Sequence, residues 1–337
     1  MSAIAIYSNS FIVYWSAIVI VLGIAAWFCL SMALYRGDGG RGSAMWLVLA
    51  VGTVLSVLFC RAIHWYCNFE QYESFIAAIT DYSVGSYCLP GMFLGLLLAG
   101  LLAAKLRFAD SAAVLFDALA PGAALGIAMF RLSALFNSSC RGNLAITPPI
   151  LQRLPFASQV AVSAGTTEYR LATFFIQFIL MLILTAALVY FFLRRRNEPK
   201  KWGRQRGYVA GLFLVVYSAM EVILDSTRYD SCVLRSNGFV SVVQIVSAVI
   251  IVVILCVYTH RSVKANGRKW YHFAIWAGYV LSLAMAGGSE YFVQRHRDWF
   301  IYCYAIMALG LVLMVTMVRL MYKTLLVKEE GSEDQNG

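Results

Sequence analysis

The stretch YVAGLFLVVYSAMEVILDS, residues 208–226, is long and apolar enough to cross a lipid bilayer as one helix. It nevertheless contains Glu221 and Asp225, and Arg228 follows shortly after it. At 100° per residue, these three side chains and Tyr217 project within about 80° of one another, a quarter of the helix circumference. The stretch therefore predicts a membrane-spanning helix with a single polar stripe.

The whole chain has the composition of an integral membrane protein. Of its 337 residues, 61% are hydrophobic and 13% are charged, and the mean hydropathy is +0.73. A water-soluble fold of this size could not bury so much apolar surface in one core. The fold class that we expect is all-α, a polytopic transmembrane helical bundle of about nine spans. These lie at about 11–35, 45–66, 86–104, 112–136, 169–193, 208–226, 239–258, 270–289 and 299–322.

The formal net charge of +10 indicates how the spans are oriented. Most of the 27 Lys and Arg residues lie in alternate loops and in the C-terminal tail, which the positive-inside rule assigns to the cytoplasm. We therefore expect the N-terminus outside, the C-terminus inside, and outer segments at 67–85, 137–168 and 227–238. The outer segment 137–168 contains Pro148-Pro149 and is expected to form a surface cap or an amphipathic helix.

Two classes of partner are not indicated by the sequence. The basic run of residues 194–206 lies between two spans with no domain around it, which favours a topogenic role over nucleic-acid binding. The eight cysteines show no CxxC or CxxH spacing, so we expect neither a metal nor a cofactor. In the third span Gly85, Gly91, Gly95 and Gly100 form a series of small residues, which favours close helix packing.

Charged side chains recur where two spans approach the outer leaflet. Arg131, Asn137 and Arg141 lie at or beyond the end of the fourth span, and Glu221 and Asp225 lie near the end of the sixth. An ionised side chain at the bilayer centre costs about 2.5–3.5 kcal/mol on insertion scales, so such residues usually face a protein interior or a wet cavity. Two interpretations are open. Arg131 forms a structural ion pair with a carboxylate of the sixth span, or these groups bind a lipid head group through its phosphate.

The segment order resembles the prolipoprotein diacylglyceryl transferase (Lgt) family over about residues 10–260. Asp117-Ala-Leu-Ala-Pro121 leads to Arg131 with the spacing of the family's signature helix. Two positions after that arginine depart from the family pattern, because Ala134 and Ser139 stand where the family has Asn and Glu.

The later family pattern Tyr-x-x-x-Arg-x-x-x-Glu-x-x-Arg resembles the series that starts at Tyr217. Here Glu221 stands in place of the central Arg, Asp225 in place of the Glu, and Arg228 is retained. The family's His-Gly-Gly motif would fall in residues 88–95, which contain no His. The resemblance implies a seven-helix core in residues 1–260 and two additional C-terminal spans in 261–326. The polar, charged composition of residues 327–337 predicts a disordered cytoplasmic tail.

The resemblance also implies a function. Members of this family transfer a diacylglyceryl group from phosphatidylglycerol to the cysteine of a lipoprotein signal peptide and release glycerol phosphate. By analogy Arg131 and Arg228 hold the phosphate with Arg141 as a third cation, and Asp225 orients an arginine or assists proton removal. Glu221 either replaces the missing base or neutralises Arg131. The implied catalytic residues are thus Arg131, Asp225 and Arg228, and the implied substrate-binding residues are Tyr217, Glu221, Arg141 and Asn137.

The implied partners are a phospholipid, phosphatidylglycerol by analogy, and lipoprotein signal peptides, in a bacterial plasma membrane. Because the family's His, Asn and central Arg are replaced, two alternatives to the transferase stay open. They are a divergent lipid-modifying enzyme and a non-catalytic protein that binds lipid.

Overall fold

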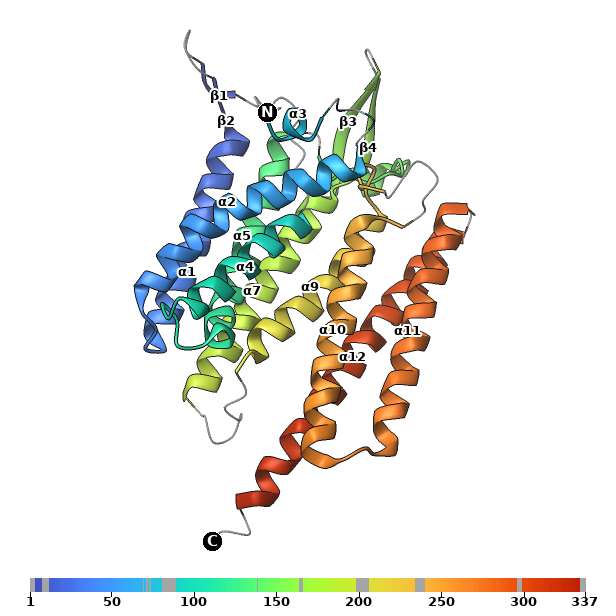
Figure 1. The fold of residues 1–337 in the computed structure, drawn as a ribbon. Coiled ribbons are helices and arrows are strands. Elements are labelled where there is room, and N and C mark those ends of the chain that lie inside the picture. Colours follow the sequence, from blue (N-terminus) through green and yellow to red (C-terminus); the bar gives the residue numbers. More distant parts are fainter. Residues whose placement is uncertain are drawn as a thin grey trace. The chain divides into compact units, whose positions relative to one another are not determined.

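Helices make up most of the chain, as predicted for an all-α membrane protein (Figure 1). The computed structural model describes residues 4–7, 12–68, 70, 72, 74–80, 89–137, 139–163, 166–197, 206–233, 240–295 and 299–333. Each of the segments predicted to span the membrane holds a helix. These helices are α1 (Trp15–Gly37), α2 (Gly42–Cys67), α4 (Leu89–Lys105), α5 (Ala112–Ser133), α7 (Thr173–Asn197), α9 (Tyr208–Ser226), α10 (Val242–Asn266), α11 (Trp270–Arg295) and α12 (Phe300–Glu333).

Seven helices in the described part of the chain are long and apolar enough to cross a membrane, namely α1, α2, α5, α7, α9, α10 and α12. The apolar part of α4, Pro90–Lys105, is shorter. The protein is therefore a multi-pass integral membrane protein. Runs of apolar residues produce this architecture, since a helix satisfies its own backbone hydrogen bonds where lipid offers no partners.

Short elements connect the long helices. They are two antiparallel hairpins, β1 (Ile4–Tyr7) with β2 (Ile12–Tyr14) and β3 (Ala157–Ser163) with β4 (Thr166–Leu171), the helices α3 (Phe75–Thr80) and α6 (Pro149–Gln152), and the 3₁₀ turn η2 (Ala134–Phe136). Segment 137–168, which is predicted to lie outside, thus holds α6 and most of a β-hairpin in place of the amphipathic helix that we considered. Strand β4 also occupies the predicted start of the fifth span, because TTEYRL pairs with β3, so α7 begins only at Thr173.

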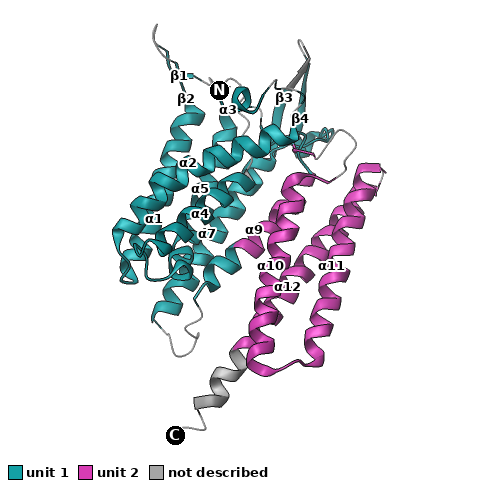
Figure 2. Ribbon diagram, viewed as in Figure 1, with its two compact units in different colours: residues 1–198, 205–213, 227–230 teal, residues 199–204, 214–226, 231–337 magenta. Residues whose placement is uncertain are grey.

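The chain folds into two compact units (Figure 2). Unit 1 comprises residues 1–198, 205–213 and 227–230, and unit 2 comprises residues 199–204, 214–226 and 231–337. The division falls inside α9. The domain boundary expected near residue 260 stays a prediction. Helix α12 continues to Glu333, so helix occupies part of the segment that the sequence predicts to be disordered, and residues 334–337 lie outside the described residues.

Helix α5 is the centre of unit 1, where it packs against α1 and α7, while α2 packs against α4. Its alanines and glycines allow the close packing with α1. A Cβ atom on Gly122 would lie 2.1 Å from Ser31 Oγ and 2.7 Å from the Trp27 carbonyl oxygen, so only glycine permits this crossing. The same helix ends at Ser133, two residues after Arg131.

Unit 2 is built on α10, α11 and α12, with α12 packed against both of its neighbours. Ile251 and Leu255 of α10 and Met307 and Met321 of α12 are fully buried. Helix α10 begins with a capping box, in which Ser241 Oγ accepts from the Gln244 N–H and the Gln244 side chain accepts from the Ser241 N–H.

A buried carboxylate ties three helices of unit 1 together at the end opposite to Arg131. Asp117 of α5 is fully buried and forms an ion pair with Arg195 of α7. It also accepts hydrogen bonds from the backbone N–H groups of Gly207, at 2.8 Å, and Ala210, at 2.9 Å. These groups lie at the start of α9, so Asp117 caps a helix that is distant in sequence.

Candidate functional site

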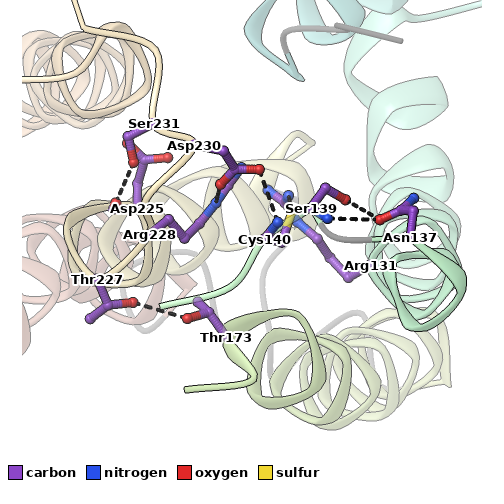
Figure 3. Close-up of polar contacts among 10 residues, drawn as sticks. All are labelled: Arg131, Asn137, Ser139, Cys140, Thr173, Asp225, Thr227, Arg228, Asp230 and Ser231. Atoms are coloured by element: carbon purple, nitrogen blue, oxygen red, sulfur yellow. Dashed lines mark hydrogen bonds and ion pairs between the residues drawn. The ribbon is translucent and has the colours of Figure 1, made fainter. Parts of the chain in front are cut away.

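Asp230 lies where several hydrogen-bond donors of unit 1 converge. Its Oδ1 accepts from Arg228 Nε at 3.0 Å, and its Oδ2 accepts from the backbone N–H of Cys140 at 2.9 Å (Figure 3). The Asp230 side chain is 26% exposed and that of Arg228 is 11% exposed. The Asp230 carboxylate therefore links two segments that lie 90 residues apart in the sequence, and it remains partly exposed.

Arg131 forms a hydrogen bond to the thiol of Cys140, in the loop that also bonds to Asp230. Its Nη1 donates to Cys140 Sγ at 2.9 Å, and the arginine is only 2% exposed (Figure 3). Cys140 is a buried free thiol that packs with Ala134, Ala172 and Phe174. Arg131, Cys140, Arg228 and Asp230 together are called the polar cluster below.

Backbone pairing positions the two halves of the polar cluster. Gly142 and Arg228 form an antiparallel bridge, the Asn143 N–H donates to the Thr227 carbonyl at 2.9 Å, and the Tyr229 N–H donates to the Arg141 carbonyl at 3.1 Å. Residues 141–143 and 227–229 therefore run side by side as short extended segments. Because these bonds join backbone atoms, they fix the position of Arg228 whatever its side chain does.

Residues at the start of α7 form hydrogen bonds to residues in or next to both of these paired segments. Thr173 Oγ1 and Thr227 Oγ1 lie 3.2 Å apart and share a hydrogen bond (Figure 3). The Phe174 N–H donates to the Cys140 carbonyl at 3.1 Å. The loop that follows α5 and the segment that follows α9 are thus both anchored on one rigid helix end.

Electrostatics hold Asp230 in its ionised form. Burial alone raises the pKa of the Asp230 carboxyl, but the Arg228 guanidinium, its hydrogen bond, the Cys140 N–H and the charge of Arg131 outweigh burial. The pKa of Asp230 therefore lies below its ordinary value. The polar cluster thus stabilises a negative charge at the position of this carboxylate, with two guanidinium groups and a backbone N–H around it.

Arg141 has a different environment from the other two arginines. It is 6% exposed, and its Nη2 donates to the carbonyls of Asn137, at 2.8 Å, and Ala134, at 3.4 Å. Its guanidinium also contacts the Ser158 hydroxyl and lies 4.9 Å from the centre of the Phe174 ring. Two of its partners are thus carbonyls at the end of the α5–η2 helix, a position that favours a cation.

Asn137 is exposed and organises its own turn. Its Oδ1 accepts from the Ser139 N–H at 2.9 Å and from the Ser139 hydroxyl (Figure 3). Contacts of this kind are typical of an Asx turn. The substrate-binding roles predicted for Arg141 and Asn137 stay predictions.

The other predicted site residues lie on the part of α9 that belongs to unit 2. Tyr217, Glu221 and Asp225 are all buried, and the Asp225 carbonyl accepts from Ser231 Oγ at 2.6 Å. Their predicted roles, and the predicted pairing of Arg131 with Asp225 or Glu221, stay predictions. The polar stripe itself needs a correction. Helix α9 ends at Ser226 and Arg228 lies in the extended segment beside Gly142, so Arg228 does not continue the helical face.

The structure thus brings two of the predicted arginines to one carboxylate that sequence reasoning missed. Asp230 lies two residues after Arg228. An acidic residue so close to a candidate phosphate-binding arginine was the feature of the sequence that could have pointed to it. Cys140 gave no comparable signal. A lone cysteine among small residues looks like a core residue, and only the fold places its sulfur against Arg131.

Comparison with known proteins bears on the identity of this site. The family model described as prolipoprotein diacylglyceryl transferase matches residues 3–260. A phosphatidylglycerol–prolipoprotein diacylglyceryl transferase from Clostridium kluyveri is 24% identical over 269 residues, which cover 80% of this chain and 99% of that protein. The protein of the same name from Thermotoga maritima is 23% identical over 241 residues, which cover 70% of this chain and 77% of that protein. These matches confirm the resemblance seen in the sequence. Because the matched region covers most of the polypeptide and includes the polar cluster, the chain belongs to the prolipoprotein diacylglyceryl transferase family.

Proposed function

We propose that this protein transfers a diacylglyceryl group from phosphatidylglycerol to the thiol of a lipoprotein precursor. In this proposal the protein lies in a bacterial inner membrane, and the end of the helices that carries the β3–β4 hairpin faces the outside. The substrate class comes from the names of the relatives, which act on phosphatidylglycerol and prolipoprotein.

The observation that carries the proposal is the convergence of donors on Asp230. Arg228 Nε and the Cys140 N–H bind the two carboxylate oxygens, and Arg131 adds positive charge. A phosphate diester accepts hydrogen bonds from the same donors and carries the same charge as a carboxylate. We assign the head-group phosphate to this region, where it contacts Arg131 and Arg228.

The reaction needs positive charge on the leaving phosphate. The sulfur of the acceptor forms a bond to the terminal glyceryl carbon of the lipid, the carbon–oxygen bond to the phosphate breaks, and glycerol phosphate leaves with the electron pair. Negative charge grows on the departing oxygen in the transition state. Fixed guanidinium groups stabilise that charge without reorganising, and a single such donor contributes about 10²–10³-fold to the rate.

The acceptor thiol must lose its proton for this reaction. Asp230 is a weak proton acceptor because its pKa is lowered. We assign proton removal to Asp225, a buried carboxylate three residues before Arg228. On this assignment Asp225→Asn lowers turnover at neutral pH and leaves lipid binding in place.

A second candidate function is lipid binding without catalysis. Ala134 stands where the family pattern has Asn, and its methyl group packs in a buried cluster with Cys140 and Phe174. That position therefore offers no polar group to a substrate. A protein with this function binds phosphatidylglycerol through the polar cluster and releases no glycerol phosphate.

A reconstituted assay separates these functions. The full chain in vesicles of phosphatidylglycerol is incubated with a signal-peptide substrate that contains one cysteine, and mass spectrometry measures the lipidated peptide and the released glycerol phosphate. Arg131→Gln and Arg228→Gln each lower turnover by about 10²-fold or more. Release of another lipid product indicates a divergent lipid-modifying enzyme.

Arg153→Gln is the matched control, because Arg153 is an exposed arginine outside the polar cluster. It retains wild-type turnover. Binding of the lipid with no product from the wild-type protein favours the second candidate. Wild-type turnover in both Arg131→Gln and Arg228→Gln excludes the proposed phosphate site.

A further inference from the structure

Strand β3 forms one edge of a small set of paired segments that leads to the polar cluster. It pairs with β4 from Ala157 opposite Leu171 to Ser163 opposite Thr166. On its other side β4 pairs with the segment after Arg141, through the bridge between Ala145 and Arg170 and the bond from the Ile146 N–H to the Tyr169 carbonyl. That segment in turn pairs with residues 227–229. The order across the pairing is β3, β4, 142–146 and 227–229.

The outer side of β3 carries no further strand within the described residues. Native proteins usually block such an edge with charged residues, proline or an early bulge. The sequence of β3, ASQVAVS, contains no charged residue and no proline. Its pairing with β4 is regular from Ala157 to Ala161, and the only irregularity lies beyond that, near the hairpin tip. On this outer side the Ala157 N–H already donates to the Leu154 carbonyl at 3.0 Å. From the Ala157 carbonyl to Ala161, the described residues place no further strand on the edge, so this part can accept another extended chain.

The edge is continuous with the proposed active site. Ser158 of β3 contacts the Arg141 guanidinium, and Arg141 follows Cys140 of the polar cluster. Gln159 of the same strand is exposed, and its side chain donates to the hydroxyl of Tyr169, its partner on β4, at 2.8 Å. This bond stabilises the cross-strand pair next to Ser158. The hairpin projects past the ends of α5 and α7 (Figure 1). A chain that leaves the membrane beside these helices therefore passes along β3.

We propose that β3 binds the acceptor polypeptide by strand addition, through the residues that follow the acceptor cysteine. This inference rests on the proposed function, which makes a lipoprotein precursor the acceptor. In a precursor the apolar signal segment precedes the cysteine and remains in the membrane, so the residues after the cysteine are those that reach the outer hairpin. Backbone hydrogen bonds carry most of the affinity in this mode of binding, so precursors of different sequence are accepted.

The spacing follows from strand geometry. Neighbouring strands lie about 4.8 Å apart, so four spacings place a chain on β3 roughly 19 Å from the segment that carries Arg228. An extended chain covers that distance in about six residues at about 3.3 Å per residue. The segment that pairs with β3 therefore begins about six residues after the acceptor cysteine.

The test changes the peptide and leaves the protein intact. Synthetic precursor peptides carry a single N-methyl group at each successive position after the cysteine, and binding to the full chain in phosphatidylglycerol nanodiscs is measured by fluorescence anisotropy. Strand addition predicts that every second N-methyl group weakens binding by about two- to tenfold, the effect of one lost hydrogen bond, over about five residues. The intervening positions bind as the unmodified peptide does.

A second measurement locates the peptide on the protein. A photo-crosslinking residue in place of Gln159 labels the peptide at positions about six or more residues after the cysteine, and the same residue in place of exposed Trp270 does not. Uniform or absent sensitivity to N-methylation overturns the inference, even if the thiol is lipidated and the proposed function stands. Crosslinks at Gln159 that join two copies of the chain and persist with peptide present also overturn it. Alternating sensitivity without any lipidated product supports docking on β3 and counts against the proposed function alone.

Discussion

Asp230 shows how one carboxylate organises a site built from distant segments. It receives hydrogen bonds from Arg228 and from the loop that contains Cys140, and it lies in the field of Arg131. Without a carboxylate there, the positive charges of Arg228 and Arg131 lose this compensation. In the absence of an anionic ligand, Asp230 therefore keeps the cluster assembled, and an approaching phosphate competes for the same donors.

The first prediction concerns Asp230→Asn. The amide has one acceptor oxygen in place of two, so one of the two donors loses its partner, and the charge that stabilises both arginines is lost. Because hydrogen bonds to charged groups contribute about 1.5–3 kcal/mol, we expect the variant to be destabilised by an amount in that range at neutral pH. Thermal unfolding of the purified protein in detergent measures the difference, with Asp38→Asn, at an exposed aspartate, as the control.

The pH dependence of this difference tests its electrostatic origin. A lowered pKa in the folded state stabilises the protein above the ordinary aspartate value of about 3.9. That stabilisation is lost as the pH falls through the pKa of the folded state, which lies below this value. The difference in stability between the wild type and Asp230→Asn should therefore be largest near pH 7 and shrink below about pH 4. A gap that stays constant down to pH 3 shows that shape, and not charge, is responsible.

At the scale of helices, Asp117 anchors the beginning of α9. It accepts from two backbone N–H groups at that end and pairs with Arg195 at the end of α7. The second prediction is that Asp117→Ala destabilises the protein by about 3–5 kcal/mol, since removing one partner leaves a buried cation and open helix donors. Asp110→Asn, at an exposed aspartate seven residues earlier, has little effect in the same thermal unfolding measurement. Equal effects of both variants contradict the capping role.

The third prediction concerns the packing of α4 on α2. A Cβ atom on Gly95 would lie 2.3 Å from the backbone nitrogen of Ser56 and 2.5 Å from its Cα, so the two helices touch through their backbones. This confirms close packing as the role of that glycine. Gly95→Ala must push the helices apart, and we expect a loss of at least about 1–3 kcal/mol.

The control for Gly95→Ala is Gly287→Ala in α11. Beyond the helix's own nearby backbone, a Cβ atom there meets no atom of the described residues within 4 Å, so the substitution is tolerated and its helix preference stabilises the protein by up to about 1 kcal/mol. Thermal unfolding and the yield of folded protein in detergent compare the two. The packing argument fails if both alanine variants behave alike.

The positions of the long helices could be predicted from the sequence, because apolar runs such as residues 208–226 depend only on local composition. The hairpin β3–β4 could not, since its pairing with residues 142–146 depends on tertiary contacts that no local pattern encodes. The same reason explains the site. Arg131 was predicted from the cost of charge in a membrane and Arg228 from the family pattern, whereas the part played by Asp230 follows from the backbone pairing of residues 141–143 with 227–229.

At the scale of the whole molecule, the family match and the compact units divide the chain differently. The match ends at residue 260, whereas unit 2 joins most of α9 and α10 to α11 and α12. Tyr304 of α12 donates to the carbonyl of Ser226, the last residue of α9, at 3.2 Å. Helix α12 therefore holds the end of the helix after which the segment with Arg228 begins.

The fourth prediction is that a chain truncated after residue 260 loses stability although it contains the whole family match. Ile251 and Leu255, which are fully buried in the complete chain, lose their helix partners. Lipid can cover such apolar residues, so the loss comes from packing and from hydrogen bonds such as that of Tyr304. We expect a lower unfolding temperature and, through the end of α9, lower turnover. Supplying residues 261–337 as a separate chain should restore both. Tyr304→Phe removes only the hydroxyl and should reproduce a small part of the defect. If the truncated chain keeps its full unfolding temperature and turnover, residues 1–260 form an autonomous core and the C-terminal helices serve another purpose.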